Sequence, residues 1–579
     1  MLSRRNLSTN LIAALATSSI AQAALDGHCP PLGPVLPAPT NPAAHGSVKS
    51  AVHNIWDDFQ NFTAEFGSTG LSIAVKSIHE ASPLLELHHT PPVLNPNGTT
   101  VIDSQTVYRL GSISKLFAVL SILQQNQIKM DDLVTQYVPE LLELKGETDE
   151  SNDITTVRWE EVTLGALASH MSGIGADLVN DLASIPTDWT QVGLPQLNES
   201  SKTGCAGVLG LPPCNRTEFF RDFGKRHPVY APFTNPVYSN VASAILGFAV
   251  EAIINTTYEN YVKQSIFDPL SMTNTTIFTG PKKDSWGFIP VNETWWGSSL
   301  GYEDIAGGFY SNTLDLLSFG TGILRHTVLD PDKTRKWMKP LTSTSSSCLL
   351  LGGPWEIIRS NTVTKDKRLV EFYCKAGNLA SYNNELCLVP DYDLVITILS
   401  GGPESSADLV DLALSKLVQG LLPAIEDAGK AEAMSKFGGT YADASTNSTI
   451  TLSLDDAPGF GISDWVVRDV DIIENYAKFA ALSSTPTDQA VSVRLYPTNL
   501  FSDCRAAWRA VFDIGTPEQL AAKDANLFWS DASCHTWGSM DRLTYGFRSI
   551  DEFIFELESD GSARTLDLRA FKVKLAKES

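Results

Sequence analysis

Hydrophobic residues along the chain follow two different periodicities. Up to about residue 425, short apolar runs that suit buried strands alternate with segments of helical spacing. The runs Gly70–Val75 and Leu394–Leu399 predict strands near the two ends of this region. Helical spacing near 55–66 and over 408–422 predicts a helix next to each strand. We therefore expect a mixed α+β domain, an antiparallel sheet flanked by helices, over residues 51–425.

Beyond Gly438 the pattern changes to alternation of apolar and polar residues, which is typical of half-buried strands. It is clearest in 450–454, 491–495 and 571–575, and Asp560-Gly561 supplies a turn. We expect a small all-β domain over 436–579, joined to the first domain by a linker at 426–435. Two domains also suit a chain of 579 residues, which is more than one hydrophobic core usually organises.

The first residues have the order of a cleavable signal peptide. Arg4 and Arg5 precede an apolar run at 11–16, and small residues end at Ala23. The apolar run is shorter than the ~20 residues that a membrane-spanning helix needs. We expect residues 1–23 to be removed and the Pro-rich residues 24–50 to form an extended lead-in, giving a secreted, extracellular protein.

Acceptor sites for N-linked glycans agree with secretion. Asn-x-Ser/Thr sequons recur along the mature chain, and an occupied sequon marks a surface position. The asparagines are Asn61, Asn97, Asn198, Asn215, Asn255, Asn274, Asn292 and Asn447.

The eight cysteines also suit an oxidising compartment. Their even number and the lack of a C-x-x-C pair favour disulfides over a zinc site. Cys374–Cys387 has geometric support, because the two residues flank a predicted hairpin. Nearness in sequence predicts Cys205–Cys214 and Cys504–Cys534, and Cys29–Cys348 then remains.

The formal net charge of −23 opposes binding to phosphate-rich partners. No run of Lys and Arg with interleaved aromatic residues offsets it. We expect no nucleic-acid partner and no membrane partner, and the sequence leaves the oligomeric state open. His88-His89 and His170 lack further ligands at metal-binding spacing, so we expect no metal site.

The sharpest chemical signal is Gly111-Ser112-Ile113-Ser114-Lys115, which opens a segment of helical spacing. Ser112 and Lys115 are three residues apart, so they share one face of a helix and the amine can approach the hydroxyl. A serine hydroxyl needs a nearby base to act as a nucleophile. Lys115 can serve if its pKa is lowered by burial and by a second cation, and Lys375 is the candidate for that cation.

Tyr238-Ser239-Asn240 precedes another helical segment and offers a phenol for proton transfer and an amide for orienting a substrate. The ordered motifs Ser112-x-x-Lys115, Tyr238-x-Asn240 and Lys375-x-Gly377 resemble those of the serine β-lactamase and penicillin-binding-protein family, closest to its class C and esterase branch.

Further segments carry the same resemblance. His170-Met171-Ser172-Gly173 is similar to the family's S-H-T-S-G-L turn, and Ile305–Ser311 with Asp315-Leu316 is similar to its A-G-G-L-x-S-T-x-x-D-L segment. The likeness covers roughly Val52 to Ile425. Phe437–Tyr441 looks like the start of the lipocalin-like barrel that many fungal members carry.

The resemblance implies a transpeptidase-like catalytic domain that works without a cofactor on a small-molecule ester or amide. It assigns Ser112 as the acylated nucleophile and Lys115 with Tyr238 as the proton-transfer pair. Asn240, Lys375 and Gly377 would position the substrate, and the backbone N–H groups of Ser112 and Asn378 would form the oxyanion hole. An acyltransferase acting on a secondary metabolite and a silent binding protein on the same fold are the alternatives.

One position departs from the family pattern. Ala376 stands where K-T-G has Thr, whose hydroxyl helps to hold the carboxylate of β-lactams, so small esters or a specialised amide are expected to be better substrates than penicillins. Two other motif matches are rejected. The literal K-T-G at Lys202-Thr203-Gly204 is interpreted as a loop, and the G-x-S-x-G at 297–301 lacks the preceding strand and following helix that a nucleophile elbow needs.

Overall fold

The computed structural model describes residues 29–578 apart from 145–151, 179–180, 186, 206–210, 255, 477–490 and 530. The signal peptide predicted over 1–23 lies outside these residues. The chain forms two compact units. The larger holds Pro37–Val363 and Leu369–Glu432, and the smaller holds the chain up to Leu36, Thr364–Arg368 and Ala433–Ser579.

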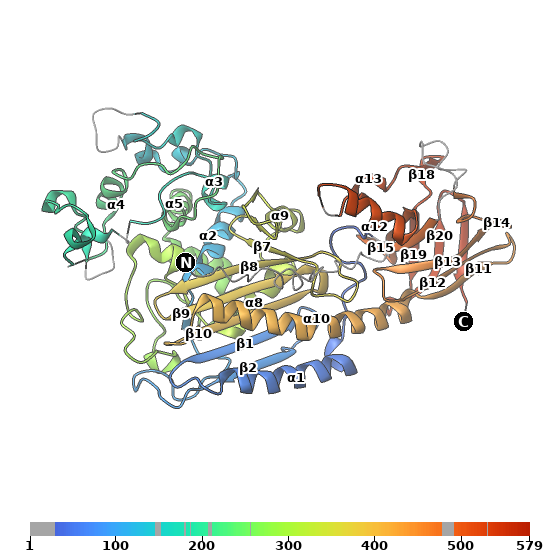
Figure 1. The fold of residues 1–579 in the computed structure, drawn as a ribbon, viewed down its shortest axis with the longest axis horizontal. Coiled ribbons are helices and arrows are strands. Elements are labelled where there is room, and N and C mark those ends of the chain that lie inside the picture. The colour runs from blue at the N-terminus through green and yellow to red at the C-terminus, as the bar shows by residue number, and fades with distance from the viewer. Residues whose placement is uncertain are drawn as a thin grey trace, which may run out of the picture. The chain divides into compact units, whose positions relative to one another are not determined.

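The larger unit is built on an eight-stranded antiparallel sheet (Figure 1). In spatial order its strands are β2 (Leu85–His89), β1 (Gly70–Ser77), β10 (Leu394–Gly401), β9 (Tyr382–Val389), β8 (Val370–Leu379), β7 (Glu356–Ser360), β6 (Leu349–Leu351) and β5 (Thr342–Ser343). The apolar run on β10 is continuous because both faces of the sheet are covered. Val395 and Leu399 enter one hydrophobic cluster, and Ile396 and Ile398 enter the other.

Helices cover both faces of this sheet. On one face lie α1 (Gly46–Thr63) and α10 (Ala407–Phe437), whose Ile55 and Leu417 share a cluster with β1 and β10. The other face is covered by α2 (Ser114–Leu123), α5 (Asn240–Glu251) and α8 (Thr313–Leu324). The remaining elements are α3 (Leu164–Ala168), α4 (Arg216–Phe223), α6 (Tyr258–Val262), α7 (Asp304–Gly307), α9 (Pro331–Trp337) and the paired β3 (Tyr108–Arg109) and β4 (Tyr310–Ser311). The predicted α+β architecture is confirmed.

The smaller unit contains a closed antiparallel barrel. Its strands run in the order β12 (Ser448–Ser453), β11 (Gly439–Asp443), β21 (Val573–Lys577), β20 (Ala563–Leu568), β19 (Glu552–Leu557), β16 (Arg505–Ile514), β15 (Val491–Ser502) and β13 (Phe460–Val467), with β14 (Val470–Asp471) beyond them. Pairing of β12 with β13 closes the ring. Ile450 and Leu452 alternate into its core, as the period-two pattern predicts. Outside the ring lie α12 (Pro517–Asn526), α13 (Thr536–Ser539), β17 (Thr544–Tyr545) and β18 (Arg548–Ser549).

The residues expected to link the two domains, 426–435, lie within helix α10. The helix continues through them because helical apolar spacing continues. Ile425 and Ala428 are buried in the cluster under the sheet, and Ala433 and Phe437 are buried in the barrel cluster. The division between the two units falls between Glu432 and Ala433.

Three disulfides join six of the cysteines. Cys374–Cys387 and Cys205–Cys214 are confirmed. The predictions Cys504–Cys534 and Cys29–Cys348 are wrong, since Cys534 bonds to Cys29 and both Cys348 and Cys504 are free and exposed. The reason is the lead-in: Val35 packs against Tyr496 and Val511 of the barrel unit, which brings Cys29 near a residue 505 positions further along.

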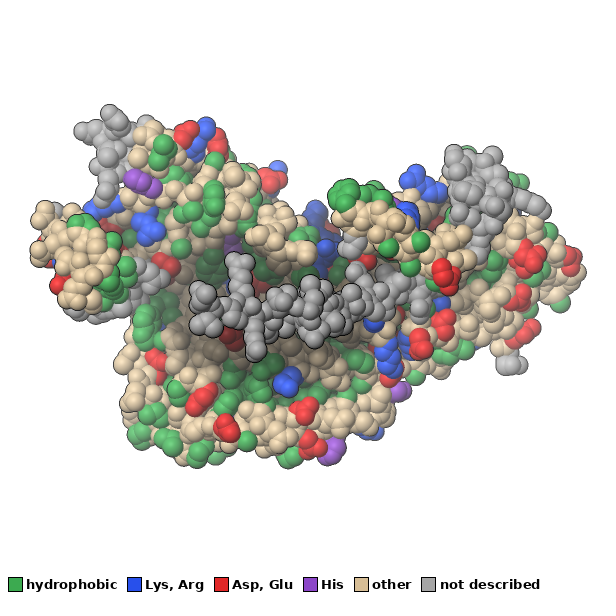
Figure 2. Space-filling view, in the orientation of Figure 1, with side chains coloured by type: hydrophobic (Ala, Val, Ile, Leu, Met, Phe, Trp, Pro, Cys, Tyr) green, Lys and Arg blue, Asp and Glu red, His purple; other side chains and the backbone are tan. Residues whose placement is uncertain are grey.

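The surface carries charge of both signs. Acidic side chains are spread over the face that Figure 2 shows, and Lys and Arg side chains lie among them. Every helix within the described ranges is too short or too polar to cross a bilayer.

Most of the described sequon asparagines are exposed, whereas Asn274 is half-buried and Asn255 lies outside the described residues. The exposed ones are Asn61, Asn97, Asn198, Asn215, Asn292 and Asn447.

Candidate active site

Ser112 lies in a short 3₁₀ turn, Gly111–Ile113, that leads directly into α2. Gly111 has a φ of +58°, a conformation that favours glycine. The close packing between the Ser112 turn and β8 also requires a glycine in each of these two segments. A side-chain carbon on Gly111 would lie 2.7 Å from the Asn378 nitrogen, and one on Gly377 would lie 2.0 Å from the Leu110 oxygen. This contact brings the backbone of the Ser112 turn against Gly377 and Asn378.

Lys115 is fully buried beneath Ser112. Its Nζ donates to Ser112 Oγ at 2.8 Å, to Asn240 Oδ1 at 2.6 Å and to the Ala306 carbonyl at 3.0 Å. These three acceptors match the three hydrogens of an ammonium group. Burial and the Lys375 charge lower the pKa of Lys115, although Tyr238 opposes part of that effect.

Tyr238 lies on the other side of Ser112 and is 41% exposed. Its hydroxyl donates to Ser112 Oγ at 2.5 Å. The Nζ atoms of Lys115 and Lys375 lie 4.9 and 5.5 Å from the centre of its ring. Partial removal of water from the hydroxyl disfavours the phenolate, but the two ammonium groups outweigh this effect and hold the pKa of Tyr238 below its ordinary value.

Asn240 begins α5 and has its amide oriented by two partners. Its Oδ1 accepts from Lys115, and its Nδ2 donates to Asp177 Oδ1 at 2.5 Å. Because a carboxylate accepts and an ammonium donates, only one orientation of the amide satisfies both. Asp177 therefore holds Asn240 in the position that supports Lys115.

Lys375 on β8 is 1% exposed and forms an ion pair with Glu356 on β7. Its Nζ donates to Glu356 Oε1 at 2.5 Å and to the Ala376 carbonyl at 3.0 Å. Burial disfavours the charge of Lys375, but Glu356 outweighs it and raises the pKa of Lys375 above its ordinary value. Asn378 is exposed, and its side chain donates to Asn383 Oδ1 at 2.8 Å.

The structure thus brings Ser112, Lys115, Tyr238, Asn240 and Lys375 into one cluster. Gly377 and Asn378 lie against the Ser112 turn, as described above.

Four further residues belong to this cluster and were not assigned from the sequence: His170, Asp177, Glu303 and Glu356. The His170 ring lies 4.6 Å from the Tyr238 ring, and burial together with the Lys115 and Lys375 charges lowers the pKa of His170 to about 3. Burial and the neighbouring Asp177 raise the pKa of Glu303 to about 8. His170 is therefore neutral, and Glu303 holds its proton at neutral pH.

Only His170 carried a sequence signal, through the turn motif at 170–173. Asp177, Glu303 and Glu356 lie at positions that no recognised motif includes, and only the fold brings them to Lys115 or Lys375.

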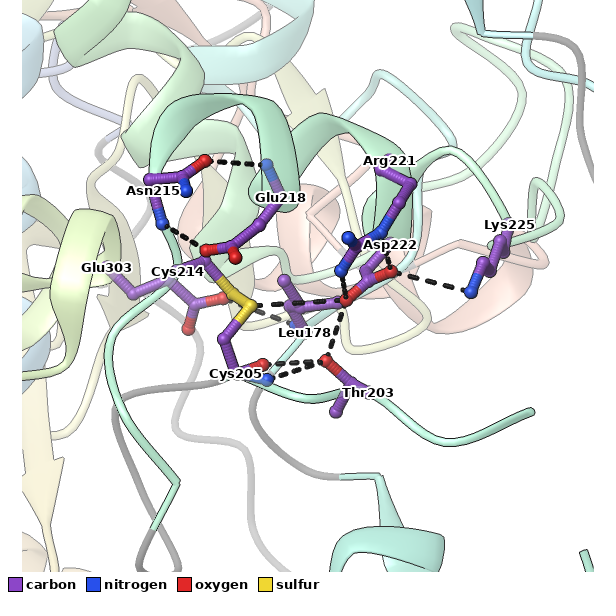
Figure 3. Close-up of a disulfide and its surroundings, with 10 residues drawn as sticks. All are labelled: Leu178, Thr203, Cys205, Cys214, Asn215, Glu218, Arg221, Asp222, Lys225 and Glu303. Atoms are coloured by element: carbon purple, nitrogen blue, oxygen red, sulfur yellow. Dashed lines mark hydrogen bonds and ion pairs between the residues drawn. A yellow bond between two sulfur atoms is a disulfide. The ribbon is translucent and has the colours of Figure 1, made fainter. Parts of the chain in front are cut away.

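The two rejected motifs have structural roles. Thr203 of the literal K-T-G lies in a loop, and its hydroxyl donates to Asp222 at 2.9 Å beside the Cys205–Cys214 disulfide (Figure 3). Ser299 of the G-x-S-x-G donates to Asp304 at 2.6 Å and precedes a 3₁₀ turn. Among the described residues, no group of three His, Cys, Asp or Glu side chains could hold a metal ion.

Comparison with known proteins gives matches over most of the chain. A family model described as "Beta-lactamase" matches residues 87–420, and one described as "Beta-lactamase-like-like, C-terminal domain" matches 429–579. The chain is 28% identical over 569 residues to a "Beta-lactamase-like protein" of Arthroderma benhamiae, covering 92% of this chain and 93% of that protein. It is 24% identical over 592 residues to a "Probable hydrolase clz13" of Cochliobolus lunatus, covering 95% and 91%. A solved class C β-lactamase has a TM-score of 0.46 at 17% identity and covers 65% of this chain and 96% of its own.

Proposed function

The chain belongs to the β-lactamase family, and from that premise we propose that it is a secreted serine hydrolase that cleaves an ester or amide through an acyl-enzyme on Ser112. The observation that carries the proposal is the pair of hydrogen bonds that Ser112 Oγ receives from Tyr238 and Lys115. A serine hydroxyl needs an adjacent proton acceptor to attack a carbonyl carbon.

Tyr238 is the proton acceptor in this proposal. Two ammonium groups lower the pKa of Tyr238, so its hydroxyl can lose its proton while Lys115 stays charged. The Tyr238 oxygen also lies within hydrogen-bonding distance of Ser112 Oγ. The phenolate takes the Ser112 proton as Oγ bonds to the substrate carbonyl carbon. Tyr238 then gives that proton to the leaving alcohol or amine as the ester or amide bond breaks.

Lys115 stays positively charged through this step and stabilises the phenolate. The N–H groups of Ser112 and Asn378 would receive the oxyanion, since the packing of Gly111 against β8 brings these two segments together. In the second half of the reaction, Tyr238 takes a proton from water, the water oxygen attacks the acyl carbon, and the free acid leaves while Ser112 regains its hydrogen.

The test compares wild type with Ser112→Ala on p-nitrophenyl esters and nitrocefin. We expect the variant to lose turnover, with the esters as the better wild-type substrates. Intact-mass analysis after treatment with a fluorophosphonate should show one adduct on the wild type and none on the variant. Undiminished ester hydrolysis by Ser112→Ala would refute the assignment, and transfer of the acyl group to an added alcohol in place of water would identify an acyltransferase.

Secretion and glycosylation belong to the same proposal. The three disulfides and the exposed sequons support it, together with the signal-peptide pattern of residues 1–23. Enzymatic removal of N-linked glycans from protein collected from the culture medium should lower its mass. A protein of unmodified mass that stays inside the cell would contradict this part of the proposal.

A further inference from the structure

A buried carboxyl group lies behind the residues that support Lys115. Asn240 accepts a hydrogen bond from Lys115 and donates one to Asp177 Oδ1 at 2.5 Å. The next residue, Leu178, donates its backbone N–H to Glu303 Oε1 at 3.2 Å (Figure 3). Lys115 is thus connected through Asn240 to the Asp177-Leu178 segment, and Glu303 holds that segment.

Glu303 is also connected to Lys115 along its own segment of the chain. It directly precedes α7, whose Ala306 carbonyl accepts from Lys115 Nζ at 3.0 Å. The other two hydrogen bonds of this ammonium group go to Asn240 and to Ser112 Oγ. Two of the three acceptors of Lys115 therefore depend on where Glu303 lies, and the third is the nucleophile.

Glu303 and Asp177 form a pair of neighbouring carboxyl groups away from bulk water. Glu303 is 4% exposed, and two like charges in one buried site are unfavourable. Burial, the Asp177 charge and a hydrogen bond between the two side chains raise the pKa of Glu303 to about 8, against the opposing effects of the Leu178 N–H and the Lys115 charge. A neutral carboxylic acid can donate its O–H and accept through its other oxygen. Protonated Glu303 therefore satisfies both Asp177 and the Leu178 N–H.

We infer that Glu303 is a positioning residue for the hydrolysis: as a neutral carboxylic acid it donates a hydrogen bond to Asp177, and through that contact it fixes the support of Lys115. The inference rests on the proposed function and adds a residue to the machinery of the same site. Glu303 itself touches neither Ser112 nor the substrate in this account. It acts by keeping the Asp177 carboxylate where it orients the Asn240 amide.

The groups around Glu303 predict what the loss of its proton would do. The charges that act on it are those of Asp177 and of Lys115 on α2. Helix α5 packs against the same turn with neutral buried side chains, and Asp304 has its own partners in the preceding loop. Arg226 donates to the Asp177 backbone carbonyl at 3.0 Å. Ionised Glu303 would lose its hydrogen bond to Asp177 and repel it, so the two carboxylates would separate and the support of Lys115 would shift.

The experiment measures kcat and KM for p-nitrophenyl hexanoate as a function of pH in wild type, Glu303→Gln and Glu303→Leu. A glutamine amide donates to Asp177 and accepts from Leu178 as the neutral acid does, so Glu303→Gln should keep kcat near the wild-type value at neutral pH. In Glu303→Leu both contacts are lost. Its kcat should fall by roughly 10- to 100-fold, the effect of losing a hydrogen bond to a charged group, with KM little changed.

The pH profile separates positioning by a neutral acid from a purely structural role. In wild type the rate should fall as the pH rises through about 8, where Glu303 loses its proton, ahead of the fall that loss of the Lys115 proton causes. In Glu303→Gln that first fall should be absent, so the alkaline limb should lie at higher pH. Asp315→Asn is the matched control and should keep the wild-type profile, because Asp315 is a buried carboxyl group that accepts from Asn274 and Thr275 instead.

The outcomes distinguish failure of this inference from failure of the proposed function. A wild-type rate that stays level well beyond pH 8 overturns the inference, whether or not the variants fold. An alkaline limb at the same pH in wild type and a folded Glu303→Gln also overturns it, as does an equal loss of kcat in Glu303→Gln and Glu303→Leu. All three results leave the Ser112 chemistry intact. If Ser112→Ala hydrolyses the ester as well as wild type does, the proposed function fails, and the inference fails with it.

Discussion

At the scale of single residues, the chemistry depends on two ammonium groups that lie beside the Tyr238 ring, whose hydroxyl contacts Ser112 Oγ. Lys115 and Lys375 both lower the pKa of Tyr238, and Tyr238 in turn opposes the loss of the Lys115 proton. The active form then has a phenolate beside two ammonium groups. The rate of ester hydrolysis should therefore rise with pH as Tyr238 loses its proton. It should fall at higher pH, where Lys115 loses its proton.

The Lys375 charge can be tested through this pH dependence. In Lys375→Met one of the two cations is lost, so the pKa of Tyr238 should rise toward its ordinary value. The acid limb of kcat/KM for a neutral p-nitrophenyl ester should therefore move to higher pH. Lys375→Arg keeps the charge and should keep the limb close to the wild-type position. An acid limb that stays in place in Lys375→Met would show that another group than Tyr238 titrates there.

Sequence reasoning located the residues that belong to contiguous motifs but not those that support them. Ser112 and Lys115 were found because helical spacing places residues three apart on one face. Asp177 was not found, because its role depends on which way the Asn240 amide points, and nothing local fixes that. Glu356 is similar: an acidic residue at the start of a strand is ordinary until the strand order places it beside Lys375.

At the scale of elements, the site depends on the close approach of the Ser112 turn to β8. A methyl group on Gly377 would lie 2.0 Å from the Leu110 carbonyl oxygen, which is backbone and cannot rotate away. Gly377→Ala should therefore push the turn away from β8 and separate the Ser112 and Asn378 N–H groups. Loss of one oxyanion donor costs roughly 100- to 1,000-fold in kcat, and we expect a loss of this order.

The matched control is Gly297→Ala, because a side-chain carbon at Gly297 has open space around it. That variant should keep wild-type kcat for the same p-nitrophenyl ester. Circular dichroism spectra of both variants should match wild type. A Gly377→Ala enzyme with wild-type kcat would show that the packing of this turn does not set the catalytic geometry.

Strand prediction succeeded where the local pattern is unambiguous. The Leu394–Leu399 run is buried on both faces and lies in β10, and all but the last residue of the alternation at 450–454 lies in β12. The hairpin of β8 and β9 placed Cys374 opposite Cys387 in register, so this disulfide could be predicted from the sequence. Residues 426–435 were harder to assign, because a helix that continues between two cores has the same local signals as one that ends.

At the scale of the whole molecule, the disulfides show what sequence distance cannot predict. Cys504 is 30 positions from Cys534, yet Cys534 bonds to Cys29 at the far end of the chain. The lead-in belongs to the barrel unit, with Leu36 in the barrel cluster and the Cys29 carbonyl accepting from Thr536. Pro-rich segments without apolar periodicity carry no signal for the partner they will pack against.

The Cys29–Cys534 bond should stabilise the barrel unit without affecting catalysis. Removing it with Cys29→Ser and Cys534→Ser together prevents mispairing with the free Cys504. Losing a disulfide typically costs about 2–4 kcal/mol of unfolding free energy, so calorimetry should show a lower melting temperature for the barrel transition. Ester hydrolysis at 25 °C should be unchanged, because Ser112, Lys115 and Tyr238 all lie in the larger unit.

The control is Cys348→Ser, which removes an exposed free thiol and should change neither the melting temperature nor ester hydrolysis. Peptide mapping without reduction gives the direct check: a free thiol at Cys29 in the wild-type protein would show that this bond, and with it the tie between the lead-in and the barrel, does not form.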